Sequence, residues 1–134
     1  MANAIYPLWK AQLLQFTTNN NLSAGTVKVA LIDTGTYTYS AAHQFFSSAS
    51  TASIGTPQTL TTKTFTNGIF DADNATFTAV TGASVEALIV YIDTGATGTS
   101  PLVAFLDTSV TGLPVTPNGG NISITWDATG IFAL

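Results

Sequence analysis

The run ALIVYI at residues 87–92 and the run LVAFL at residues 102–106 decide the fold of this chain. Both runs are continuously apolar, both have the length of a β-strand, and both are built largely from leucine, β-branched and aromatic residues. Such runs predict strands that are covered on both faces, or strands that present one face to a partner. The fold is therefore expected to centre on a β-sheet.

Weaker patterns on either side predict the remaining strands. Residues 27–31 alternate apolar side chains with Lys28 and Ala30, as a half-buried strand does, and this pattern ends at Asp33. Further strands are predicted at 59–66 before an Asn-Gly turn, at 76–80, at 122–126 after a hairpin signal at 118–120, and at 132–134. A chain of 134 residues with this pattern predicts a mainly β, single-domain antiparallel β-sandwich or jelly-roll-like fold.

One short N-terminal α-helix is predicted at residues 5–18. An aromatic and aliphatic stripe recurs there at helical spacing, and Pro7 suits the first helical position. The stripe consists of Tyr6, Trp9, Leu13 and Phe16. A helix this short needs a docking partner, which is either the sheet of its own chain or a neighbouring chain.

Residues 40–57 are rich in serine and alanine and show no strong period, so they predict a long loop or arm. Aromatic residues lie just before this segment and within it. Together with the helical stripe they are the candidate interface residues, namely Tyr37, Tyr39, Phe45 and Phe46. Aromatic side chains are frequent anchors of protein interfaces.

The chain carries very little charge. Three lysines and seven acidic residues make up 7% of it, whereas about 25% is usual in soluble domains. This composition favours burial against other protein subunits, although a monomer with a hydroxyl-rich surface is an alternative. A net charge of −4 without arginine argues against nucleic acid as a partner. We expect no membrane span, because no apolar run approaches about 18 residues, and no export signal.

The triplet Asp-Thr-Gly occurs at 33–35 and at 93–95, with an echo at Asp107-Thr108. Two such triplets resemble the loops of aspartic proteases, in which paired carboxylates share a proton. Turn formation is the favoured interpretation of Asp33 and Asp93, because aspartate at the first position of a turn accepts backbone N–H groups. Sixty residues between the triplets are also too few for a protease lobe.

Other chemical groups are sparse. Asp71 and Asp73 offer oxygen atoms to a cation, but the EF-hand pattern is absent and a solvated turn is favoured. His43 is the only histidine and has no cysteine or serine motif to activate, so a packing or hydrogen-bonding role is expected. With no cysteine for thiolate sites either, we expect a non-enzymatic protein without a cofactor or metal.

Several runs resemble a family of small virion structural proteins of tailed bacteriophages and prophages. The resembling runs are MANAIYP at 1–7, TVKVALIDTG at 26–35, YTYSAAH at 37–43, TGASVEAL at 81–88 and GLPVTPNGG at 112–120. The resemblance implies a capsid decoration (cement) protein on the exterior of the virion, with the major capsid protein or other virion proteins as partners. It also implies a homo-oligomer, with a trimer favoured. The alternative roles are a tail, neck or head-fibre component, or a surface-binding appendage.

Overall fold

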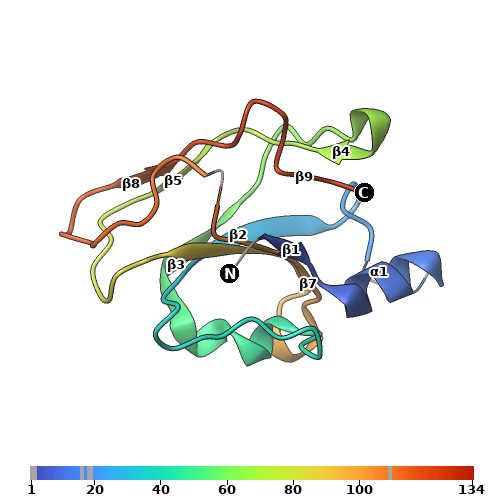
Figure 1. The fold of residues 1–134 in the computed structure, drawn as a ribbon, viewed down its shortest axis with the longest axis horizontal. Helices are drawn as coiled ribbons and strands as arrows, with labels where there is room; N and C mark the ends of the chain where they lie inside the picture. Colours follow the sequence, from blue (N-terminus) through green and yellow to red (C-terminus); the bar gives the residue numbers. More distant parts are fainter. Residues whose placement is uncertain (1–2, 16, 18–19, 109) are drawn as a thin grey trace.

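A five-stranded antiparallel sheet forms the centre of the computed structural model, which describes residues 3–15, 17, 20–108 and 110–134 (Figure 1). Its two central apolar runs are neighbouring strands, as their composition requires. Across the sheet the order is β1 (Ala4–Ile5), β7 (Leu102–Leu106), β6 (Ala87–Asp93), β2 (Thr26–Ile32) and β3 (Ser53–Thr59). The strands predicted at 27–31, 87–92 and 102–106 are therefore confirmed.

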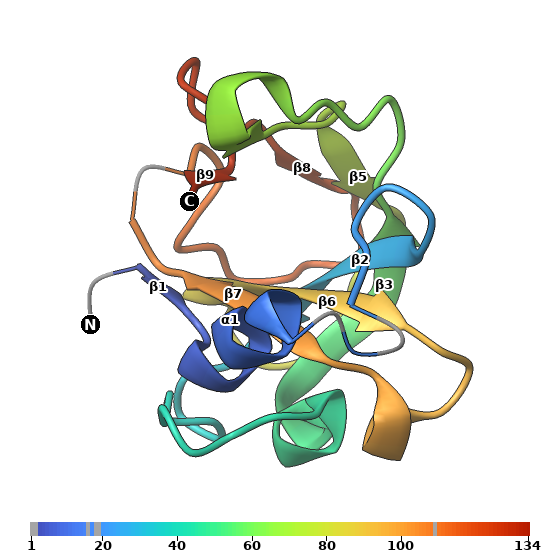
Figure 2. The same cartoon turned by 90° about the vertical axis from the view of Figure 1, so that its right-hand side faces the viewer.

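Two short ribbons form a second layer over one face of this sheet (Figure 2). Strand β4 (Ile69–Phe70) pairs with β9 (Phe132–Ala133), and β5 (Ala75–Phe77) pairs with β8 (Ile122–Ile124). Three of the four described 3-10 turns lie on the other side of the sheet. The helix α1 (Pro7–Leu14) lies at one end of the sheet, where Trp9 contacts Phe132 of β9 (Figure 1). The 3-10 turns are η1 (Phe46–Ser48), η2 (Ser50–Ala52) and η4 (Thr97–Thr99) below the sheet, with η3 (Thr66–Gly68) beside β4. The molecule is thus the predicted mainly β, β-sandwich-like domain.

Strands β6 and β7 are buried because both faces of the sheet are covered by the chain itself. Leu88 of β6 lies directly opposite Leu31 of β2 and Leu106 of β7. Tyr91 points to the other face, since side chains alternate along a strand, and its ring stacks on Phe46 of η1 with centroids 3.9 Å apart. The apolar runs consequently need no second chain to cover them.

The helix is shorter than the predicted 5–18. Helix α1 spans Pro7–Leu14, and the prediction of Ile5 as helical is wrong, because Ala4–Ile5 pairs with β7. A proline disfavours helical backbone in the residue before it, and Tyr6 is extended with φ −64° and ψ 123°. Gln15 is the C-cap, and residues 16 and 18 lie outside the described residues.

Strand β3 spans Ser53–Thr59, so two predictions are wrong. The loop predicted at 40–57 ends earlier, and the strand predicted at 59–66 lies earlier in the sequence. Residues 53–59 pair with β2 at the edge of the sheet, with an irregularity in register between Val29 and Leu31. An edge strand tolerates Pro57, which lacks an N–H donor, and the positive φ of Gly55 at such an irregularity. Residues 60–66 contribute no strand, and Thr62 has a positive φ of 54°.

The turn at 118–120 is real, but it does not form the predicted hairpin. Strand β8 pairs with the distant β5, and the turn extends that ribbon: Gly119 donates its N–H to the Val80 carbonyl at 2.7 Å, and Val80 donates to Gly120 at 3.0 Å. Strand β5 is shorter than the predicted 76–80, because Ala79 adopts a positive φ of 49°. The short strand predicted at 132–134 is confirmed by β9.

Candidate interaction surface

The two Asp-Thr-Gly triplets lie at opposite ends of the central sheet. Asp93 pairs with Thr26 at the start of β2, whereas Asp33 follows the last residue of that strand. The seven-residue length of β2 therefore separates the two aspartates, roughly 23 Å at the usual strand rise. Carboxylates that share a proton must be within hydrogen-bonding distance. Asp33 and Asp93 of one chain therefore do not form the paired site that the aspartic-protease alternative requires.

Each of these aspartates instead folds its own turn. Gly35 donates its N–H to Asp33 Oδ1, and Gly95 donates to Asp93 Oδ1, both at 2.9 Å. The same bond to the residue two positions on is made by Asn21, Asn118 and Asp127. Local turn chemistry thus explains why the triplet recurs, and the turn interpretation of Asp33 and Asp93 is confirmed.

Asp93 is also the acidic partner of a salt bridge. Its Oδ2 lies 2.7 Å from Nζ of Lys28, and both side chains are about one-quarter exposed. The bond from Lys28 and then the Gly95 N–H lower the pKa of the Asp93 carboxyl below its ordinary value. These interactions favour the charged form of the carboxylate, which stabilises the turn at residues 93–95 and the salt bridge to Lys28.

The carboxylates of Asp71 and Asp73 also accept hydrogen bonds from their own chain. Asp71 Oδ1 accepts the N–H of Ala72 at 2.9 Å, and Asp73 Oδ2 accepts the hydroxyl of Thr62 at 2.7 Å. No group of three acidic, histidine or cysteine side chains gathers as a metal site within the described part of the chain. Residues 71–74 do not form the predicted turn: Asp71 is bridged to Thr64, and the Asp73 carboxylate joins its segment to Thr62.

The candidate interface residues divide into core and partly exposed positions. Tyr6, Trp9, Tyr37 and Phe46 are buried in the core of their own chain, while Leu13, Tyr39 and Phe45 are half-buried. Phe16 lies outside the described residues. These four side chains belong to the core of their own chain, which is the alternative to an interface role; Trp9, for example, packs against Phe132 of β9. His43 has the expected hydrogen-bonding role, since its Nδ1 lies 2.9 Å from the Tyr37 hydroxyl.

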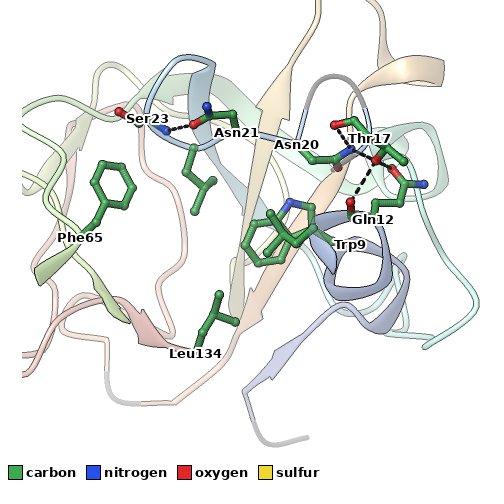
Figure 3. Close-up of a pocket in the computed structure, with 10 residues that line it drawn as sticks. Trp9, Gln12, Thr17, Asn20, Asn21, Ser23, Phe65 and Leu134 are labelled. Atoms are coloured by element: carbon green, nitrogen blue, oxygen red, sulfur yellow. Dashed lines mark hydrogen bonds between the residues drawn. The ribbon is translucent and has the colours of Figure 1, made fainter. Parts of the chain in front are cut away.

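An apolar groove lies between α1 and the end of the chain, and we call it the α1 groove (Figure 3). Its volume is about 520 Å³. Trp9 of α1 lies on one side of the groove, and Phe65 and Leu134 lie on the other side. Leu13 and Leu22 complete the apolar lining. These residues come from four separate segments, which explains why no local sequence pattern reveals the groove.

The described lining of the α1 groove contains no charged side chain. Its polar residues bond to one another at the rim: Asn20 Nδ2 donates to Gln12 Oε1 at 3.0 Å and to Thr17 Oγ1 at 2.7 Å. Trp9 is 2% exposed, and its indole Nε1 has no hydrogen-bond partner among the described residues. The groove thus offers apolar surface, while the indole N–H of Trp9 is buried beneath that surface.

Lys63 holds residues 22–25, which include the lining residues Leu22 and Ser23, in place. Nζ of Lys63 donates to three carbonyl oxygens, those of Leu22 at 2.7 Å, Gly25 at 2.8 Å and Ser23 at 3.3 Å. All three donors of the ammonium group are therefore matched by acceptors. This clamp joins the segment that precedes β2 to the segment that carries Phe65.

Large exposed apolar side chains gather at this groove. Leu14 is 89% exposed, Leu134 is 68% exposed and Phe65 is 41% exposed. Phe65 and Leu134 line the groove, and Leu14 lies on α1 next to the lining residue Leu13. The sequence analysis missed all three. The one available signal was Leu14, an apolar residue that falls outside the helical stripe.

Comparison with protein-family models and with curated proteins finds no match to this chain. Within the described residues, the only α-helix is the eight-residue α1, and no helix is long and apolar enough to cross a membrane. The α1 groove is the candidate functional site, because it combines a concave shape, exposed apolar side chains and a lining without charged side chains.

Proposed function

We propose that this chain is a non-catalytic structural protein of a phage particle, which binds the capsid shell and stabilises it. The observation that carries the proposal is the α1 groove, an apolar surface without charged side chains, in which Phe65 and Leu134 are exposed. Such a surface binds protein in preference to nucleic acid or a polar metabolite. The resemblance of the sequence to small virion proteins supports the phage particle as the location of this protein.

The acidic and histidine side chains support a structural role. Asp33, Asp93 and Asp127 hold turns, Asp73 accepts a threonine hydroxyl, and His43 is bonded to a buried tyrosine. A catalytic acid, base or nucleophile needs a second group within reach in a pocket. The α1 groove is lined by no carboxylate side chain or histidine.

The low charge of the chain supports protein partners. We propose the major capsid protein or other virion proteins as the binding partners on the exterior of the virion, and a homo-oligomer, with a trimer favoured. A protein that binds the assembled shell more tightly than its free subunits stabilises the shell by mass action. A net charge of −4 is unfavourable for contact with packaged DNA.

A test uses particles assembled without this protein. Purified wild-type chain should bind these particles in a sedimentation assay and raise the temperature at which their DNA becomes accessible to a dye. The variant Phe65→Ser should bind more weakly, because it removes an exposed apolar wall of the groove. The matched control Thr116→Ser changes an exposed residue in the segment that leads into β8, at the far end of the molecule from α1 (Figure 1).

The location of the chain decides between this proposal and its alternative. Cryo-electron microscopy of intact particles should show density for the protein over the capsid surface. Density confined to the tail or neck would make the capsid assignment wrong and favour a tail, neck or head-fibre component. For a surface-binding appendage, only Tyr39 and Phe45 of the four loop aromatics remain partly exposed, which leaves few rings for ligand contact.

A further inference from the structure

A second pocket lies at the end of the central sheet where β2 ends, β6 begins and β7 ends, and we call it the Glu86 pocket. Its volume is about 450 Å³. Among its lining residues, Thr34 follows β2, Glu86 directly precedes β6 and Asp107 directly follows β7. The α1 groove instead includes Leu22 and Ser23, which precede β2. The two sites therefore lie at opposite ends of β2.

Aromatic rings form much of the apolar lining of the Glu86 pocket. The ring of Tyr39 packs beside that of Phe105, with centroids 5.7 Å apart, and Tyr37 lies on the other side at 6.3 Å from Phe105. Phe105 and Tyr37 are buried, whereas Tyr39 is half-buried. Thr38 and Pro114 of the lining are exposed, so the pocket opens to solvent. Tyr39 is consequently the ring that an occupant of the pocket contacts.

Two carboxylate side chains line the same pocket, those of Glu86 and Asp107, and both residues are half-buried. Glu86 Oε1 accepts the N–H of Thr34 at 3.0 Å and the hydroxyl of Thr34 at 2.9 Å. These two bonds hold the carboxylate group in place and leave Oε2 without a hydrogen bond from the described residues. The pocket thus contains a positioned negative charge with one oxygen that can accept further bonds.

None of the three lysines of the chain lines this pocket. Lys28 lies near the other end of β2, where it is bonded to Asp93. Lys63 is bonded to backbone carbonyl groups beside the α1 groove, and Lys10 is exposed on α1. Carboxylates that no nearby lysine neutralises create a negative potential in a partly enclosed site, and this potential attracts a cation.

We infer that the Glu86 pocket receives an arginine side chain of a different protein. The face of a guanidinium group packs on an aromatic ring while its edge donates to carboxylate oxygens, and Tyr39 and Glu86 offer these two features in one pocket. A lysine ammonium lacks the planar face and the forked donors. A second copy of the chain supplies no arginine, and two copies with a net charge of −4 repel each other.

This inference goes beyond the proposed function, because it concerns a second site and defines the chemistry of the partner. The partner presents a basic surface with an accessible arginine. The inference holds whether or not that partner belongs to a phage particle.

A short peptide with one arginine, capped as acetyl-Gly-Arg-Gly-amide, tests the inference on the purified chain. NMR titration should shift the backbone amide resonances of Thr34, Glu86 and Asp107 as the peptide binds. The matched peptide with citrulline in place of arginine keeps the planar group but carries no charge. It should bind at least about tenfold more weakly, because the charge-assisted hydrogen bond to the carboxylate is lost. Added salt should weaken binding of the arginine peptide, since the pocket is open to solvent.

Two variants remove the charge and the ring separately. Glu86→Gln keeps an Oε1 acceptor for Thr34 but loses the charge, and it should weaken binding of the arginine peptide about tenfold. Tyr39→Leu keeps an apolar side chain but removes the ring, and it should weaken binding about two- to fivefold. Asp127→Asn is the matched control, because it removes the same charge from an exposed residue that does not line the pocket. Circular dichroism checks that every variant is folded.

Several results would overturn the inference. Resonances at the pocket that do not move with the arginine peptide in large excess would show that no arginine binds there. Equal binding of the arginine and citrulline peptides, or equal binding by the wild type and Glu86→Gln, would show that the carboxylate does not select the occupant. Self-association that is lost in both Lys10→Met and Glu86→Gln would identify a lysine of a second copy as the occupant. A failure to bind capsids leaves these measurements unaffected, since they use the purified chain alone.

Discussion

The hydroxyl oxygen of Tyr6 lies 2.7 Å from the hydroxyl oxygen of Tyr37, and both side chains are buried in the core. Tyr37 is in turn bonded to Nδ1 of His43 at 2.9 Å, so three side chains form one hydrogen-bonded chain. Burial, followed by the bond with Tyr37, raises the pKa of Tyr6 far above its ordinary value. The hydrogen bonds between Tyr6, Tyr37 and His43 fix the start of α1 to the segment that leads into η1.

Removal of the central hydroxyl should cost more than removal of the terminal one. Tyr37→Phe leaves the fully buried hydroxyl of Tyr6 without its one partner among the described residues, and we expect a loss of about 1–3 kcal/mol in the free energy of unfolding. Tyr6→Phe leaves Tyr37 bonded to His43 and should cost about 1 kcal/mol or less. Urea denaturation of both variants, with Tyr39→Phe as the control, measures the difference. Equal losses in the free energy of unfolding for Tyr37→Phe and Tyr39→Phe would contradict a stabilising role for the hydrogen bonds between Tyr6, Tyr37 and His43.

Alkaline pH should destabilise the fold through Tyr91. Burial, with the nearby charge of Asp93 as a smaller cause, raises the pKa of Tyr91 to about 12 from an ordinary 10.0. Because the folded pKa is the higher one, this contribution to stability is complete below pH 10 and is lost as the pH rises towards about 12. Tyr91→Phe retains the ring that stacks on Phe46 but should lose less stability over this pH range. A variant with the same alkaline profile as the wild type would refute this assignment.

Replacement of the two triplet aspartates by asparagine should affect stability differently at Asp33 and at Asp93. An amide oxygen replaces the carboxylate oxygen in the turn, so Asp33→Asn should change the free energy of unfolding by less than about 0.5 kcal/mol. Asp93→Asn also loses the salt bridge to Lys28, which is worth up to about 1 kcal/mol at a partly exposed site. Since the pKa of Asp93 is lowered on folding, the wild type should lose this advantage as the pH falls below 3.8. Unfolding at pH 7 and pH 3 compares the two variants.

Proteolytic activity in the wild type that disappears in both variants would show that these aspartates do chemistry. Such activity would require two copies of the chain to supply one carboxylate each, since Asp33 and Asp93 of one copy lie at opposite ends of the sheet.

The parts of the fold that the sequence predicts correctly are those with a local cause. The apolar runs at 87–92 and 102–106 are strands because their length and composition suit a doubly covered sheet, and Asp33 forms a turn with its own neighbours. Strand β3 escapes prediction because Gly55 and Pro57 are poor strand residues, and only its place at the sheet edge makes them acceptable.

The candidate site could not be predicted in the same way. The helical stripe identifies Trp9 as a residue that must be covered, but spacing alone cannot say whether its own chain or a neighbour covers it. The α1 groove depends on Leu22, Phe65 and Leu134, which tertiary structure brings to α1 from distant positions. A site assembled from long-range contacts has no periodic signature.

Replacement of Lys63 should loosen residues 22–25, which contribute to the lining of the α1 groove. Lys63→Met retains the aliphatic stem but removes the ammonium group from the carbonyls of Leu22, Ser23 and Gly25, and we expect a loss of about 1–3 kcal/mol. Hydrogen exchange of amides in residues 20–25 should accelerate in this variant. Lys10→Met at an exposed position of α1 is the control and should change neither quantity. Unchanged exchange in Lys63→Met would mean that the clamp does not hold this segment.

Trp9 and Leu14 lie on the same helix, and their alanine variants should differ in folding stability. Trp9 is 2% exposed and meets Phe132 edge-on with ring centroids 6.0 Å apart, so Trp9→Ala should lose about 3–5 kcal/mol of folding stability. Leu14 is 89% exposed, so Leu14→Ala should leave the free energy of unfolding within about 0.5 kcal/mol of the wild-type value. Thermal unfolding of dilute samples measures both effects. If Trp9→Ala folds as stably as the wild type, α1 is not anchored to its own sheet, and a neighbouring chain becomes the partner of this helix.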